Sequence, residues 1–485
     1  MLNLFKTFIY RQKDIISFSN SQSILYFSTL IICFLFFMHG DIYHTATSSY
    51  AYLEGHLFDF YAYNKNIMHG NDYLPLIYLI FAAWNLPLHL LGLTTIPIEP
   101  THSTLLLSLP SSPIEMMWWK LLMVLFYLGS INTIYKIAKH INVNQSVKPS
   151  IISTLFASSP FVVFSVFIFT GYDVISVYFT LLGLYHYLKK DIKQFVLFFS
   201  LAISFKYFAA IIFFPLVLMI EKRPLHIIKL LVLGSLALII QLAIYWKSPV
   251  FQEEIFNLLL QKIQGNAGNI KNMAREISAI FIYIFICAHL FFKRFDQLTE
   301  WQKYSIFVPL LSYALMFFGV IWHPQWVIIT TPFVALGYLF IRNKRFMGIL
   351  EIIGMFCFTW FVVNQWRLNV DVSMMNRSIL KDVLPQVLLI NADLMHRHNN
   401  LFRSLFNLYL FAPLIILFYE KLQFKKIRDT VLSQKLILSR LVIGISFFVI
   451  PSFVCLLMPK DLAMRIQPEA KLRLETFLNA EKTAF

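Results

Sequence analysis

Long apolar runs are the feature that most restricts what this chain can fold into. Runs of 15 to 25 mainly apolar residues recur from Ile24 to Met458, separated by polar stretches. Each is long enough to cross the ~30 Å hydrocarbon core of a bilayer. Because lipid offers no hydrogen-bond partner to the backbone, we expect these runs to be helices. Only 14% of the residues are charged, against about 25% in soluble domains. The sequence therefore predicts an all-α polytopic integral membrane protein.

Positive charge is concentrated in short loops between the apolar runs and gives the chain a net charge of +16. Such clusters are typical of cytoplasmic loops in membrane proteins, so they do not indicate a nucleic-acid partner. The N-terminus carries Lys6, Arg11 and Lys13 before the first apolar run, which predicts a cytoplasmic N-terminus and an uncleaved first span. The compact loops favour a bacterial plasma (inner) membrane.

The first extracytoplasmic loop is predicted to be large. The run Tyr73–Leu91 contains two prolines, and a crossing there would move the basic segment Lys136–Lys148 to the outside. We therefore interpret Tyr73–Leu91 as an interfacial or re-entrant helix. The stretch from Gly40 to Pro113, about 75 residues long, then forms one external loop.

A hairpin is predicted for Gln194–Ile220, because basic clusters flank this run on both sides. Arms of about 13 residues would each be about 20 Å long, so the tip near Lys206 should be recessed below the outer surface. In all we expect about 11 to 14 transmembrane helices in one domain, residues 1–485. The spans predicted beyond the first, this hairpin aside, are 115–135, 149–168, 174–188, 225–246, 278–292, 304–320, 326–341, 347–363, 402–418 and 436–457.

Ionisable residues at the outer side are the candidates for chemistry. The first loop is acidic, with Asp41, Asp59 and Asp72 among its residues. Asp173 and Lys206 are predicted to lie within the membrane, where charge is costly and usually functional. A purely structural ion pair between these two is the alternative. The sequence has no Cys or His cluster typical of a metal site, so a divalent metal is not indicated.

Five segments, in this order, resemble the GT-C superfamily of glycosyltransferases that use polyprenyl-phosphate sugars. They are GDIYHT with AYLEGHLFDFY, DYLPLIYLIFAAW before MMWWKLLMVLFYL, SSPFVVFSVFIFTGYDVISVYFTLLGLY, FSLAISFKYFAAIIFFPLVL, and IWHPQWVIITTPFVAL. The resemblance covers residues 1–345, with YLPL in place of the family's Tyr-Pro-Pro-Leu element. Residues 346–485 would add C-terminal helices and an external loop. The resemblance implies a GT-C-like helical bundle with interfacial helices in its first loop. The first loop contains no Asp-x-Asp motif, so no cofactor is expected and metal dependence is not indicated.

The resemblance further implies an inverting transfer of a hexose from a polyprenyl-phosphate donor to an extracytoplasmic glycan or glycolipid acceptor. A carboxylate must take the acceptor proton, and cations must stabilise the departing phosphate. We expect the base to be Asp41, because partial desolvation at the membrane boundary would raise its pKa, with Asp72 as second choice. Asp72 is equally well placed as a helix cap, and Lys120 equally well placed to snorkel to headgroups. The residues expected at the donor phosphate are Lys206, His323 and Lys120, and those expected at substrate are Asp59, Tyr172, Asp173, Gln325 and Trp326.

Two other classes of function remain open from the sequence. The first is a lipid-linked oligosaccharide flippase or another secondary transporter, which usually contains internal repeats and short loops. The second is a membrane polysaccharide polymerase or ligase. The sequence has no detectable repeat and has a long external loop, which favours an enzyme.

Overall fold

The described part of the chain is helical. The computed structural model describes residues 15–67, 73–94, 112–141, 147–255, 270–320, 322–365, 374, 398–422 and 433–457. The N-terminal helices are α2 (Asn20–Phe36), α3 (Gly40–Ser48), α4 (Tyr50–Leu53), α5 (Phe60–Ile67), α6 (Pro75–Leu90), α7 (Pro113–Ile141), α8 (Pro149–Ala157), α9 (Pro160–Val163) and the π-helix η2 (Phe164–Ile168). There follow α10 (Asp173–Leu188), α11 (Ile192–Phe205), α12 (Ala209–Ile220), α13 (Pro224–Gly234), α14 (Leu236–Tyr245), α16 (Ile270–Phe292), α17 (Leu298–Gly319), the 3-10 helix η3 (Pro324–Ile329), α18 (Thr331–Gly337), α19 (Lys344–Gln365), α22 (Asn399–Leu422) and α23 (Gln434–Leu457).

Several of these helices are long and apolar enough to cross a membrane, so the predicted integral membrane protein is confirmed. Within the described ranges, five helices meet this criterion: α7, α16, α19, α22 and α23. Two bent pairs, α8 with α9–η2 (46°) and α13 with α14 (56°), raise the number to seven. This is fewer than the 11 to 14 spans predicted, since other apolar helices, such as α2, α11 and α12, are shorter. The single helix predicted across 326–341 is wrong, because η3 and the seven-residue α18 replace it.

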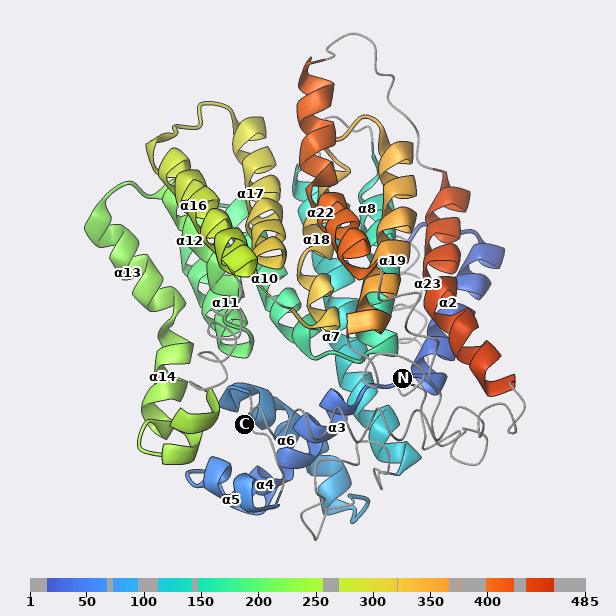
Figure 1. The fold of residues 1–485 in the computed structure, drawn as a ribbon. Coiled ribbons are helices and arrows are strands. Elements are labelled where there is room, and N and C mark those ends of the chain that lie inside the picture. The colour runs from blue at the N-terminus through green and yellow to red at the C-terminus, as the bar shows by residue number, and fades with distance from the viewer. Residues whose placement is uncertain are drawn as a thin grey trace, which may run out of the picture.

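The external loop of the sequence prediction forms a helical layer across one end of the bundle. Figure 1 shows α3 to α6 together at this end, below the long helices. Helix α6 packs on α3 and α4, and Trp84 and Trp118 exchange indole-to-carbonyl hydrogen bonds of 2.8 Å between α6 and α7. The segment predicted to be interfacial or re-entrant therefore belongs to this end layer. We call this end of the bundle the site end.

The predicted hairpin is confirmed. Helices α11 and α12 pack against each other and turn at 206–208, which puts Lys206 at the tip. Gly183 of α10 allows this hairpin to approach closely, because an added Cβ there would lie 2.5 Å from the Phe199 ring. The basic residues Lys222 and Arg223 follow the other end of α12. Lys206 is therefore separated from these cations by the length of the hairpin.

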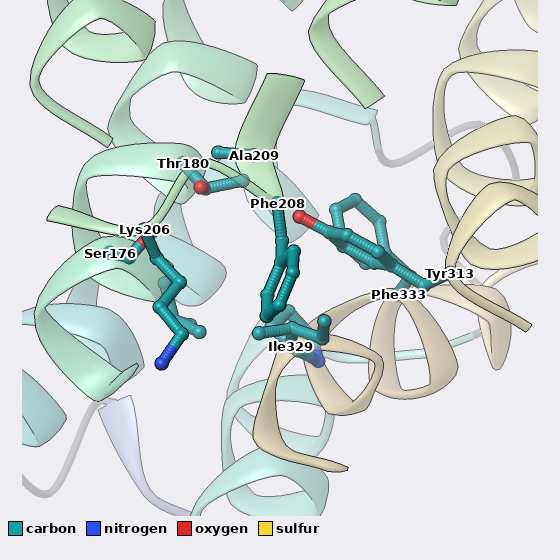
Figure 2. A pocket seen from close by; sticks show the side chains of 10 residues that line it. Ser176, Thr180, Lys206, Phe208, Ala209, Tyr313, Ile329 and Phe333 are labelled. Carbon is teal, nitrogen blue, oxygen red and sulfur yellow. The ribbon is translucent and has the colours of Figure 1, made fainter. Parts of the chain in front are cut away.

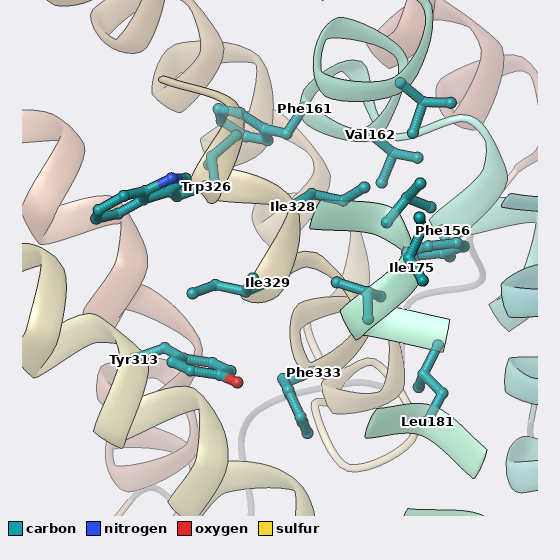
Figure 3. Packing of buried hydrophobic residues seen from close by; sticks show 14 of the residues in the cluster. Phe156, Phe161, Val162, Ile175, Leu181, Tyr313, Trp326, Ile328, Ile329 and Phe333 are labelled. Carbon is teal, nitrogen blue, oxygen red and sulfur yellow. The ribbon is translucent and has the colours of Figure 1, made fainter. Parts of the chain in front are cut away.

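Aromatic and branched side chains fill the centre of the bundle. Figure 3 shows Phe156 and Phe161 from α8 and α9, Ile175 from α10, and Ile328 and Phe333 from the η3–α18 segment in one cluster. One buried ion pair interrupts this cluster: Arg440 of α23 binds Glu351 of α19 and also donates to Ser158 (3.1 Å). A buried charge is tolerated only when paired and hydrogen-bonded, so this pair fixes the C-terminal helices onto the broken α8–α9 span.

Candidate functional site

The break between η2 and α10 builds the site locally. Thr170 has a positive φ of 62°, a conformation that costs energy for a residue with a Cβ. Gly171 follows, and an added Cβ there would lie 2.9 Å from Cβ of Gln325 and 3.3 Å from Oδ2 of Asp173. Only glycine allows the η3 segment this close to the start of α10. The turn therefore brings Gln325 against Asp173.

Asp173 and Lys206 form a buried ion pair. Lys206 Nζ lies 2.9 Å from Asp173 Oδ1, and their side chains are 8% and 1% exposed. The hydroxyl of Tyr172 lies 3.4 Å from the same ammonium. Asp173 is thus the counter-ion of Lys206. This is the structural ion pair that the sequence analysis gave as the alternative to a functional role for these two residues. In this arrangement the phosphate of a donor would share Lys206 with Asp173.

Aromatic rings enclose the Lys206 ammonium. The rings of Tyr172 and Trp326 have centroids 5.0 and 5.1 Å from Nζ, and those of Tyr73 and Phe208 lie 5.7 Å away. A cation over an aromatic face is attracted by the ring quadrupole. These rings come from the end layer, α10, the hairpin tip and η3, so Lys206 ties together four separate segments.

Asp41 lies at the start of α3, beside its N-cap residue His39. Nδ1 of His39 is 3.1 Å from both the amide nitrogen and Oδ1 of Asp41. A neutral Nδ1 can accept the amide hydrogen, and a protonated Nδ1 can instead donate to the carboxylate. The His39 ring stacks on Phe169 at 4.0 Å, which fixes its orientation. The amide of Gln325 donates to Asp41 Oδ2 at 3.3 Å.

The electrostatics at Asp41 differ from the sequence expectation. Burial by itself would raise the pKa of Asp41, as we expected from its position at the membrane boundary. The neighbouring imidazoles of His39, His323 and His44 outweigh this effect and lower the pKa below its ordinary value of 3.8. Asp41 is therefore ionised at neutral pH.

Two shared neighbours connect Asp41 with Lys206. Tyr172 hydrogen-bonds Lys206 and is close enough to interact electrostatically with Asp41. His323 interacts with Asp41 in the same way, and its ring lies 5.3 Å from Trp326, which contacts Lys206. Six of the residues predicted from the sequence thus come together with Asp173: Asp41, Tyr172, Lys206, His323, Gln325 and Trp326.

Three predicted residues are not part of this group. Lys120 is 1% exposed, and its ammonium binds the carbonyls of four residues: Cys33, Phe34, Phe37 and Phe167. This leaves no proton for a donor phosphate and excludes snorkelling, so Lys120 stabilises the junction of α2, α7 and η2 instead. Asp59 pairs with His56 at 2.9 Å and is 62% exposed, so it faces solvent. Asp72 lies outside the described residues.

The space beside the ion pair is small. A cavity of about 10 Å³ is lined by residues that include Thr180, Lys206, Phe208, Tyr313 and Phe333, and Figure 2 shows the Lys206 amine pointing away from the Tyr313 side of it. This volume holds about one water molecule.

Sequence reasoning missed several residues around the site. His39 and Tyr73 sit beside Asp41 and Lys206, but neither stands out in the sequence because histidine and tyrosine are common at membrane interfaces. Glu351 and Arg440 carried a usable signal, since both fall within predicted spans. Within the described ranges, no three side chains from His, Cys, Asp and Glu gather as metal ligands would.

No protein-family model matches the chain, and no curated protein matches its sequence.

Proposed function

We propose that the protein is an inverting glycosyltransferase that moves a hexose from a polyprenyl-phosphate donor to an extracytoplasmic acceptor. One observation carries this proposal: an ionised carboxylate, Asp41, and a buried ammonium, Lys206, share Tyr172 and the 323–326 corner at one end of an apolar helical bundle. Such a site would serve a donor whose sugar phosphate lies at the membrane surface and whose chain lies in lipid.

The proposed step needs one base and one group that stabilises phosphate. The acceptor hydroxyl oxygen attacks the anomeric carbon, and its proton passes to Asp41. The bond from that carbon to the phosphate oxygen breaks, and the electron pair leaves with the polyprenyl phosphate. Lys206 and His323 would stabilise this charge in a site of low dielectric constant. A single direct displacement inverts the anomeric configuration.

The residues around Asp41 suit the role of a base that accepts a proton from a hydroxyl. Its lowered pKa keeps it ionised, and Gln325 and His39 hold both carboxylate oxygens in place. A weak base of this kind is effective only when the leaving group is good, because proton transfer then completes late in the reaction. A sugar phosphate is such a leaving group.

The test is transfer by purified protein in nanodiscs, with a polyprenyl-phosphate hexose and a panel of glycan and glycolipid acceptors. Released polyprenyl phosphate, measured by mass spectrometry, reports transfer. We expect Asp41→Asn to lower the rate by about 10²- to 10⁴-fold, the usual contribution of a general base. The matched control is Asp296→Asn, an exposed residue in the α16–α17 connection, which should keep the wild-type rate.

Two results would refute the proposal. One is wild-type turnover in Asp41→Asn. The other is movement of intact donor lipid across a vesicle membrane without release of polyprenyl phosphate, which would indicate a transporter.

A further inference from the structure

Two arginines that are far apart in the sequence come together in the bundle. Arg275 lies near the start of α16 and Arg403 near the start of α22, and α17 packs against both helices (Figure 1). Both arginines lie at the end of α17: Arg403 donates to the carbonyl of Val320, and an added Cβ at Gly319 would lie 3.9 Å from Cα of Glu276, the chain neighbour of Arg275. The two guanidinium groups are within range of electrostatic repulsion. Partly buried charges in proteins are normally compensated by an opposite charge, so this pair requires an explanation.

Part of each guanidinium group has no hydrogen-bond partner. Arg403 donates from Nη2 to the carbonyl of Val320 at 3.4 Å and lies 5.6 Å from the Phe361 ring centroid. Nε of Arg403 and both Nε and Nη2 of Arg275 are buried without a partner in the described part of the chain. Buried donors in native proteins are nearly always satisfied. These three nitrogens are therefore free to bind an acceptor.

Between described residues, no acidic side chain forms an ion pair with either arginine. Glu276, the chain neighbour of Arg275, attracts it electrostatically. The two arginines thus form a positively charged pair with three N–H donor groups that have no partner in the described part of the chain.

The arginine pair lies at the site end of the bundle. Tyr283 of α16 donates to the carbonyl of Ile211 near the start of α12 (2.8 Å). Lys222, just after α12, donates to the carbonyl of Leu290 near the end of α16 (2.6 Å). Helix α16 therefore runs in the same direction as α12. Arg275, at the start of α16, is at the end where the hairpin tip holds Lys206.

Both helices expose apolar side chains next to these arginines. Within α16, only 17% of its 18-residue apolar stretch is buried inside the protein. This indicates a helix that faces lipid along most of its length. The large exposed residues on α16 include Ile277, Ile280, Phe281, Ile284 and Phe285, and those on α22 include Leu401, Leu405 and Leu408. A ligand with an apolar chain can therefore reach the pair sideways from the bilayer.

We propose that Arg275 and Arg403 bind the phosphate group of a membrane lipid that enters laterally beside α16 and α22. A guanidinium group matches phosphate because its parallel N–H donors fit two phosphate oxygens. Two arginines also balance the two charges of a phosphate monoester. An isoprenoid lipid phosphate and a phospholipid headgroup share this chemistry. Binding requires no transfer step, so this inference is independent of the proposed glycosyltransferase activity.

The experiment measures equilibrium binding to the full-length protein in a nonionic detergent. The probes are citronellyl phosphate, citronellol as the matched alcohol without phosphate, and dioctanoyl phosphatidic acid. We expect saturable binding of citronellyl phosphate and at least tenfold weaker binding in Arg275→Gln and in Arg403→Gln, which corresponds to about 1.4 kcal/mol. The matched control is Arg294→Gln, which removes one exposed charge after the opposite end of α16 and should bind as the wild type does.

Each outcome decides the proposal. Similar affinities for citronellyl phosphate and phosphatidic acid would support the site with a phospholipid as its source, and preference for citronellyl phosphate would support it with an isoprenoid lipid. Equal binding of citronellyl phosphate and citronellol, or unchanged affinity in both glutamine variants, would overturn it. If a glutamine variant is not monodisperse, Arg403→Lys keeps the charge without the forked donors. A three- to tenfold loss in Arg403→Lys supports the site, and wild-type affinity overturns it.

Discussion

Removing Lys206 from its ion pair with Asp173 should strongly destabilise the protein. Lys206→Met leaves the Asp173 carboxylate 1% exposed, with neither oxygen hydrogen-bonded to a described residue. Leaving one partner of a buried pair uncompensated costs about 3–5 kcal/mol, a large part of the typical 5–15 kcal/mol total. Asp173→Asn should cost less, because Lys206 keeps the Tyr172 hydroxyl and the aromatic rings around it.

The double variant distinguishes an ion pair from independent contributions. Asp173→Asn combined with Lys206→Met removes both charges, so its cost should be smaller than the sum of the single variants by more than about 2 kcal/mol. The free energy of unfolding is measured by titration with a denaturing detergent in mixed micelles.

The exposed pair Lys65–Glu253 provides the matched control. Its ions are 2.6 Å apart, but the side chains are 43% and 57% exposed. Exposed pairs contribute about 0–1 kcal/mol. Equal coupling energies for the two pairs, or single-variant costs below 1 kcal/mol at Asp173 and Lys206, would refute the assignment of a buried pair.

Three other perturbations test the site. Gly171→Ala places a Cβ 2.9 Å from Cβ of Gln325 and should cost about 1–3 kcal/mol through overpacking, measured by unfolding; an unchanged stability would contradict the close packing. Lys120→Met leaves four carbonyls without their donor and should cost at least 1–3 kcal/mol while donor affinity is unchanged; weaker donor binding in a folded variant would restore its phosphate role. For Asp41, burial raises the pKa and the imidazoles lower it below 3.8, so its ionisation stabilises the fold above about pH 4, and this contribution is lost as pH falls through the lowered pKa. Because His39→Gln removes a lowering interaction, the pKa of Asp41 and the acid limb of the pH–rate profile should both move upward, and an unshifted limb would contradict this account.

Some of the site was predictable because it depends on local rules. The acidic Asp41 directly after the first apolar run, and Lys206 at the turn of a run flanked by cations, follow from charge and run length alone. The prediction that Tyr73–Leu91 is interfacial or re-entrant follows from the same reasoning, and α6 lies in the end layer (Figure 1).

Other parts of the site depend on contacts between distant segments. Lys120 looked like any cation near the end of a span, and only the positions of α2 and η2 give it four carbonyls to bind. The imidazoles around Asp41 come from residues 39, 44 and 323, so the direction of its pKa shift required the fold. The break at η3 also overrode a run that reads as one helix.

By itself the sequence determined that this chain is a helical membrane protein and which of its residues carry charge in an apolar setting. The physical reason is that transfer into lipid and backbone hydrogen bonding act on each segment separately. Only the tertiary structure decided which charges become partners: Lys206 with Asp173 and Arg440 with Glu351. Pairing depends on distances of a few ångströms between side chains of different helices, and these distances are set by packing of the whole bundle.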